Sequence, residues 1–164
     1  MARFYLAGKM SGIPQFNFPL FDRVADALRE RGLTIVSPAE LDDPETRKAA
    51  LASPDGAPGG GSSNGETWGD FLARDVKLIA DEVDGVICLP GWTDSKGAVL
   101  ETFVAVLCGK PVYELFSKFV EDPHAMGDVP FVMTHMDPYK VLYEHRDFVL
   151  RRDTEQASKQ ASGG

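Results

Sequence analysis

Short apolar runs alternate along the chain with longer segments in which apolar residues recur every three or four positions. The short runs are typical of parallel strands covered on both faces, and we expect them at residues 3–7, 33–36, 85–89, 110–115 and, more weakly, 131–133. The longer segments have helical spacing, and they lie at residues 17–32, 67–80, 96–108 and 138–152. This order predicts an α/β fold, Rossmann-like or flavodoxin-like, in which a parallel sheet of about five strands carries helices on both faces.

The expected helix at 96–108 is apolar on every side except at Glu101. An all-apolar helix must be covered on both sides, by the sheet and by another layer or subunit. Burying an ionised group without partners is costly, so a carboxylate at this place indicates a function. Gly97, one turn earlier, leaves a gap where a ligand can approach. Asp75 is a second carboxylate on the apolar face of a helix.

One domain is expected over residues 1–152, with a long flexible loop at 41–66 and a disordered tail at 153–164. The loop is rich in Gly, Pro, Ser and Asp. A loop of this length in a compact domain is usually either a functional lid or an inert insertion, and the sequence leaves both open. The tail is small and polar, as disordered termini are.

Composition excludes several classes of partner. The 17 basic and 25 acidic residues give a net charge of −8, which argues against a nucleic-acid polymer or an anionic membrane. Cys88 and Cys108 lie in apolar runs without metal-ligand spacing and are expected to be reduced core thiols. There is neither a signal peptide nor an apolar run of membrane length. We therefore expect a protein of the cytoplasm that has no metal and no cofactor.

The candidate polar residues fall where open α/β sheets bind ligands, at the carboxyl ends of the strands. Tyr5 and the glycine-bearing segment 8–12 end the first strand, and Ser95 opens the helix after the third. Glu101 lies a turn or two deeper in that helix, and Asp75 lies near the same crevice. Several polar groups that converge in one apolar cleft predict a binding site.

The residue types narrow the chemistry. All three histidines lie in the last third of the chain, which gives little support to a Ser-His-Asp or Cys-His arrangement. The first strand lacks Gly-x-Gly-x-x-Gly and the second ends in Ser-Pro, which disfavours a dinucleotide oxidoreductase. Paired carboxylates suit glycosyl transfer, in which one acid attacks or stabilises C1′ and another, held protonated, serves the leaving group.

Several motifs together resemble the nucleoside 2-deoxyribosyltransferase superfamily. The resemblance is closest to its small phage and bacterial branch, and extends to the deoxynucleoside 5′-monophosphate N-glycosidases. It spans roughly residues 3–115. The motifs are Tyr5-Leu6-Ala7-Gly8, Met10-Ser11-Gly12, Asn17-Phe18-Pro19, Asp75 in its helix, Asp84-Gly85-Val86-Ile87 in a strand, and Ser95-x-Gly97-x-x-x-Glu101 in a strand–loop–helix context.

The resemblance implies a role for each matching residue. Glu101 would be the nucleophile that forms a deoxyribosyl ester while the base departs. Tyr5 would orient Glu101, and Asp75 would handle the proton on the leaving base, with Asp84 as a further candidate for this assistance. Nucleotide N-glycosidases have serine where nucleoside-specific members have an acid, so Ser95 points to a 5′-monophosphate.

The remaining substrate-binding candidates surround this group. Gly8, Ser11, Gly12 and Gly97 would complete the phosphate and sugar cradle. Trp92 either stacks on a base or shields the site. The chain departs from the nucleotide-cleaving members at residues 9–11, because their basic residue often lies one or two positions after Lys9. The long segment at 41–66 is also unlike the compact members.

Structural explanations stay open for several of these residues. Glu101 can pair with Lys96 or Arg74 at a subunit contact, Asp75 can pair with Arg74, and Tyr5 and Ser95 can be a core residue and a helix cap. A non-catalytic sensor of a nucleotide-derived ligand and an assembly protein are the alternative functions. The apolar central helix predicts a homodimer or larger oligomer that binds a small-molecule nucleoside or nucleotide.

Overall fold

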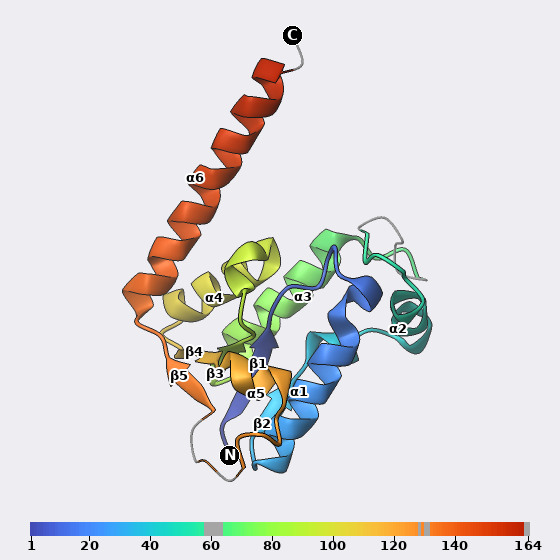
Figure 1. The fold of residues 1–164 in the computed structure, drawn as a ribbon, viewed down its shortest axis with the longest axis vertical. Helices are drawn as coiled ribbons and strands as arrows, with labels where there is room; N and C mark the ends of the chain where they lie inside the picture. The colour runs from blue at the N-terminus through green and yellow to red at the C-terminus, as the bar shows by residue number, and fades with distance from the viewer. Residues whose placement is uncertain (58–63, 128, 130–131, 163–164) are drawn as a thin grey trace.

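A five-stranded sheet forms the centre of the molecule (Figure 1). The computed structural model describes residues 1–57, 64–127, 129 and 132–162. The strand order is β2-β1-β3-β4-β5, and β1 to β4 are parallel. The strands are Arg3–Ala7 (β1), Thr34–Val36 (β2), Gly85–Cys88 (β3), Val112–Leu115 (β4) and Met133–His135 (β5). The single α/β domain and four of its strands are therefore as the sequence predicts.

The expectation of a fully parallel sheet is wrong at one edge. β5 pairs antiparallel with β4, with Tyr113 opposite His135. A parallel neighbour needs a crossover connection from one end of the sheet to the other. Here the chain leaves β4, forms the short helix α5 (Ser117–Glu121) and returns along the sheet edge in the opposite direction. The strand also begins later than predicted, and residue 131 lies outside the described residues.

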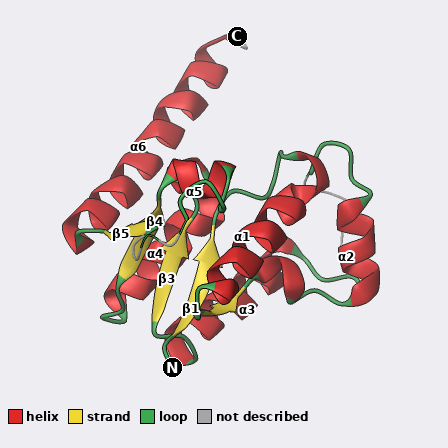
Figure 2. Cartoon of the chain, turned by 60° about the horizontal axis from the view of Figure 1, so that its bottom comes forward, coloured by secondary structure: helices red, strands yellow, loops and turns green. Residues whose placement is uncertain are grey.

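Helices cover both faces of the sheet (Figure 2). Side chains alternate between the faces of a strand, so Tyr5 belongs to one core cluster and Leu6 to the other. The helices of the Tyr5 cluster are α3 (Trp68–Asp81), α4 (Lys96–Leu107) and the first part of α6 (Pro138–Ser162). Those of the Leu6 cluster are α1 (Phe18–Glu30) and α5.

Local signals fix where α3 and α4 begin. Thr67 and Asp70 form a capping box at the start of α3. The Ser95 hydroxyl accepts the amide of Ala98 at 3.2 Å at the start of α4. Both helices therefore start where the sequence predicts, with their amino ends at the carboxyl side of the sheet.

The segment 41–66 contains a helix that the sequence did not predict. α2 spans Pro44–Leu51, and the Asp43 carboxylate caps it by accepting two backbone amides. The centre of the expected loop, at 58–63, lies outside the described residues.

The far end of α2 leads to a close contact with the loop after β1. The Gly12 amide donates to the Gly56 carbonyl at 2.9 Å, and the Gln15 amide donates to the Ser53 carbonyl at 2.8 Å. A Cβ on Gly56 would lie 2.0 Å from the Ile13 carbonyl oxygen. This segment therefore packs directly on the loop that follows β1.

The carboxy-terminal helix is longer than the sequence predicts. In place of a helix ending at 152 and a disordered tail, α6 continues to Ser162. Its first part packs on α4, where the rings of His145 and Phe103 stack with centroids 4.3 Å apart. Its last part extends away from the domain (Figure 1). The tail contains good helix formers, and continuing a packed helix needs no new nucleus.

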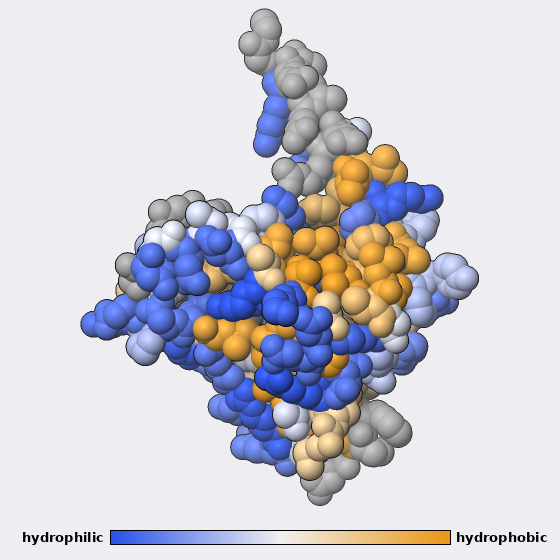
Figure 3. Space-filling view, turned by 180° about the vertical axis from the view of Figure 1, so that it is seen from behind, coloured by the Kyte–Doolittle hydropathy of each residue, from blue (hydrophilic) through white to orange (hydrophobic). Residues whose placement is uncertain are grey.

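Apolar surface is exposed where α4 and α6 meet solvent. Leu107 is 66% exposed and Leu150 is 55% exposed. Figure 3, which views the molecule from behind, shows an apolar area at the base of the protruding helix.

Candidate functional site

A tyrosine and two carboxylates meet on the sheet face that α3 and α4 cover. Tyr5 in β1 is fully buried, and Asp75 in α3 and Glu101 in α4 are each 7% exposed. The Tyr5 hydroxyl donates to Glu101 Oε1 at 3.0 Å, and the nearby charge of Asp75 helps to raise the pKa of Tyr5. The structure thus brings together the three residues that the sequence singled out for catalysis.

Packing explains why both acids are buried. α4 contacts the sheet, α3 and α6, so a side chain in the middle of this helix has little access to water. Asp75 lies one turn before Ile79, which is fully buried in the core. The apolar pattern of the two helices therefore places both carboxylates between them.

Burial strongly affects the ionisation of this group. Burial and, to a smaller extent, the charge of Asp75 raise the pKa of Glu101 to about 8, because the Tyr5 hydrogen bond and the Arg74 charge offset only part of their effect. Burial also raises the pKa of Asp75, against the opposing effect of Arg74. Burial and the two negative charges raise the pKa of Tyr5 well above its usual value. At neutral pH Glu101 is therefore mainly protonated.

Arg74 connects Asp75 to the segment 41–66. Its Nε donates to Asp75 Oδ1 at 2.9 Å and its Nη1 donates to Asp42 Oδ1 at 2.7 Å. Both aspartate side chains are 10% exposed. Burial lowers the pKa of Arg74, but the two carboxylates raise it by more, so the guanidinium stays charged. Sequence reasoning missed Asp42, because one acid 32 residues before its partner gives no periodic signal.

An open space lies beside the first turn of α4. A Cβ on Gly97 would meet only the Ser95 hydroxyl, at 4.0 Å. Ser95 Oγ also donates to the Gly8 carbonyl at 3.4 Å, which ties the start of α4 to the end of β1. Gly8 has a packing role, because a Cβ there would lie 2.8 Å from Leu89 Cδ1.

The other predicted cradle residues lie in the loop after β1. Ser11 is exposed, and Gly12 has a left-handed backbone with φ of 78°. The amide of Gly12 is already bonded to Gly56. Segment 41–66 therefore occupies one of the donors that the sequence assigned to a phosphate.

Two predicted binding residues lie away from this group. Asp84 precedes β3, and its carboxylate accepts the Arg3 amide at 2.7 Å. It therefore joins the starts of β1 and β3, at the opposite end of the sheet from Ser95. Trp92 is 1% exposed and donates its Nε1 proton to Glu114 Oε2 at 2.8 Å. Its ring packs in the core and presents no face on which a base can stack.

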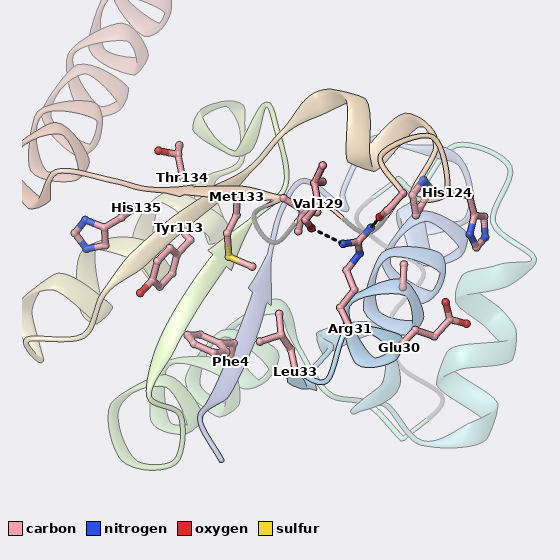
Figure 4. Close-up of a pocket in the computed structure, with 14 residues that line it drawn as sticks. Phe4, Glu30, Arg31, Leu33, Tyr113, His124, Val129, Met133, Thr134 and His135 are labelled. Atoms are coloured by element: carbon pink, nitrogen blue, oxygen red, sulfur yellow. Dashed lines mark hydrogen bonds between the residues drawn. The ribbon is translucent and has the colours of Figure 1, made fainter.

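A separate cavity of about 940 Å³ opens on the other face of the sheet (Figure 4). Phe4, Tyr113 and His135 line it, and neither Asp75 nor Glu101 does. Adjacent rings of these three residues pack edge to face. The guanidinium of Arg31, at the other side of the cavity, is bonded to two backbone carbonyls. Among the described residues that line this cavity, Glu30 is the only acid, so they include no carboxylate pair.

Within 1–57, 64–127, 129 and 132–162, no group of three or more His, Cys, Asp or Glu side chains is placed to hold a metal ion. No helix in this part of the chain is long and apolar enough to cross a bilayer.

The fold and the site define a single α/β domain with a buried tyrosine–carboxylate group beside an open helix start. Residues 2–114 match the family DUF4406, described as a domain of unknown function, and the chain belongs to this family. The match runs from β1 into β4 and includes Tyr5, Asp75 and Glu101, whereas α5, β5 and α6 follow it. No curated protein matches the chain significantly.

Proposed function

We propose that the protein cleaves the N-glycosidic bond of a 2′-deoxynucleoside or, in preference, its 5′-monophosphate, as a deoxyribosyltransferase or an N-glycosidase. One observation carries the proposal: buried Glu101 accepts the Tyr5 hydroxyl at 3.0 Å beside Asp75, in the helix α4 whose first turn is open at Gly97. This arrangement supplies a nucleophile, a group that orients it and a second acid. The resemblance to the nucleoside 2-deoxyribosyltransferase superfamily supports the same roles.

The reaction has two steps that use the two acids in turn. In the first, an oxygen of ionised Glu101 attacks C1′; the bond from C1′ to the base breaks, and its electron pair leaves with the base. Protonated Asp75 gives its proton to the departing base. In the second, water adds to C1′, the ester electron pair returns to Glu101, and the proton of water goes to Asp75. In a transferase a second base takes the place of water.

In the resting protein Glu101 is mainly protonated at neutral pH, because burial and the charge of Asp75 raise its pKa to about 8. The first step needs Glu101 ionised and Asp75 protonated. Burial also raises the pKa of Asp75, against the opposing effect of Arg74. We therefore expect a proton to pass from Glu101 to Asp75 before the first step.

A substrate panel tests the proposal directly. The protein is incubated with deoxynucleosides and their 5′-monophosphates, with and without an acceptor base, and the products are separated by chromatography. A hydrolase releases free base in both cases, and a transferase forms a new nucleoside only with the acceptor. If ligands raise the melting temperature but no base is released from any of them, the protein is a non-catalytic sensor of a nucleotide-derived ligand.

Ser95 supports a phosphorylated substrate, since neither this cap residue nor the first turn of α4 carries a negative side chain. We expect Ser95→Asp to lower activity on 5′-monophosphates by roughly 100-fold, because like charges in close contact cost several kcal/mol. Aspartate is a good helix cap, so α4 should still form. Ser95→Asn is the matched control, with the same size and no charge. Equal losses in the two variants would contradict a phosphate at this position.

We also propose that the protein is a homodimer or larger oligomer. Exposed apolar side chains on α4 and α6, among them Leu107 and Leu150, are suited to contact a second copy. Sedimentation at micromolar concentration should show an oligomer, and Leu107→Lys should shift it toward monomer. A wild-type monomer under these conditions would contradict the proposal.

A further inference from the structure

A line of charged groups leads from segment 41–66 to the carboxylate pair. Asp42 bonds to Arg74, Arg74 bonds to Asp75, and the charge of Asp75 acts on Glu101, which accepts the Tyr5 hydroxyl. We propose that Asp42 is a positioning residue of this site, which acts on Asp75 through Arg74 and so influences which carboxylate holds the proton. The catalytic role of Asp42 rests on the proposed function, whereas the electrostatic effect of Asp42 on Asp75 does not.

The geometry makes Arg74 a cation shared by two acids. Its two bonds are 2.9 Å and 2.7 Å long, and its side chain is only 28% exposed, so solvent screens the two contacts weakly. Asp42 is held in place, because it lies between the turn Pro38–Glu40 and α2, directly after Leu41, which packs on the core. The negative charge of Asp42 therefore cancels part of the stabilisation that Arg74 gives to ionised Asp75.

This partial cancellation favours protonated Asp75, which is the form that the first reaction step needs. With Arg74 bonded to Asp75 alone, the carboxylate would be held ionised and would accept a proton less readily. The charge of Asp42 raises the pKa of Asp75, and the charge of Arg74 lowers it. Asp42 thus makes Asp75 a better acceptor for the proton of Glu101 and increases the fraction of Asp75 that is protonated when the base departs.

The groups that face this pair come from each surrounding element. Tyr5 lies on β1 and Arg74 on α3. Cys88 on β3 stays a neutral thiol, because burial and the charges of Glu101 and Glu114 raise its pKa well above the usual value. On the far side of α4, His145 of α6 stacks on Phe103. Asp42 reaches Asp75 through Arg74, to which both acids are bonded.

The test is a carboxyl ¹³C NMR titration of the full chain, in which Glu101 and Asp75 are assigned with Glu101→Gln and Asp75→Asn. Asp42→Asn should move the titration of both acids to lower pH by about half a unit or more, because an anion is removed. Arg74→Gln should move it to higher pH, because a cation is removed. Asp26→Asn and Lys77→Gln are matched controls, since both alter exposed charges in surface ion pairs.

Opposite shifts separate this role from a merely structural one. If the two residues only supported the fold, either substitution would admit water and move both acids toward their usual values, that is, in the same direction. Shifts of the same sign in the two variants, or no shift in Asp42→Asn beyond that of Asp26→Asn, would overturn the proposal. If Arg74→Gln does not fold, Arg74→Lys keeps the charge, and its titration should lie close to that of wild type, whereas that of Asp42→Asn should still move to lower pH.

The titration needs no turnover, so it decides the proposal even if the wild-type protein releases no base. Where base is released, the acidic limb of the pH profile of kcat/KM should move with the same sign in each variant. Opposite NMR shifts without base release would therefore retain the link between Asp42 and Asp75 and reject the glycosidase function.

Discussion

Replacing Glu101 by glutamine is expected to reduce base release by roughly 10⁴-fold or more, the scale seen when a covalent nucleophile is removed. The amide cannot form an ester with C1′, yet it has nearly the same size and can still accept the Tyr5 hydroxyl. Chromatography of the released base measures the loss. Mass spectrometry of the wild-type protein after quenching should show a deoxyribosyl adduct that the variant lacks.

Glu121→Gln is the matched control for this experiment, because Glu121 is an exposed glutamate on α5 over the other face of the sheet. It should retain wild-type turnover. Substantial base release by Glu101→Gln would show that the carboxylate is not the nucleophile, whatever else the site does.

The same substitution should make the protein more stable at neutral and higher pH. In the folded protein the pKa of Glu101 is about 8, against an ordinary value of 4.5. The folded state therefore binds more protons than the unfolded state between these values, and stability falls as pH rises through this window. The contribution of Glu101 is fully present below pH 4.5 and is lost as pH passes 8. This change corresponds to about 3–5 kcal/mol.

Urea unfolding of wild type and Glu101→Gln at a series of pH values measures this effect. We expect similar stabilities near pH 4 and an increasing advantage of the variant toward pH 9. Carboxylates whose pKa is lowered, such as that of Glu40 beside Arg29, change the stability of the protein at acidic pH. Their contribution is the same in wild type and variant, so it cancels in the difference between the two stabilities. A constant difference across the pH range would mean that water reaches Glu101 freely.

Periodicity made most of the fold and the centre of the site predictable. Strands buried on both faces and amphipathic helices leave strong patterns, and an acid among apolar residues, such as Glu101 or Asp75, interrupts such a pattern. These signals depend only on residues near one another in sequence. Tyr5 needed the resemblance as well, because a buried tyrosine on its own has no distinctive pattern.

The remaining features depend on contacts between distant segments. The direction of β5 depends on the path of the chain after α5. The bond from Arg74 to Asp42 joins a helix to a segment without periodicity. Asp84 directly precedes β3, so it lies at the amino end of a parallel strand. Ligands bind at the carboxyl ends of such strands, and the position of Asp84 in the motif was therefore misleading. The role of Trp92 follows from the position of Glu114 on the neighbouring strand.

The packing of α6 against α4 has a consequence for the evolution of the family. The region shared with DUF4406 ends within β4, yet the outer side of the helix that carries Glu101 is covered by a helix beyond that region. A relative that lost this added helix would leave apolar side chains facing water. Such relatives should either carry polar substitutions along the outer side of this helix or have recruited a different segment to cover it.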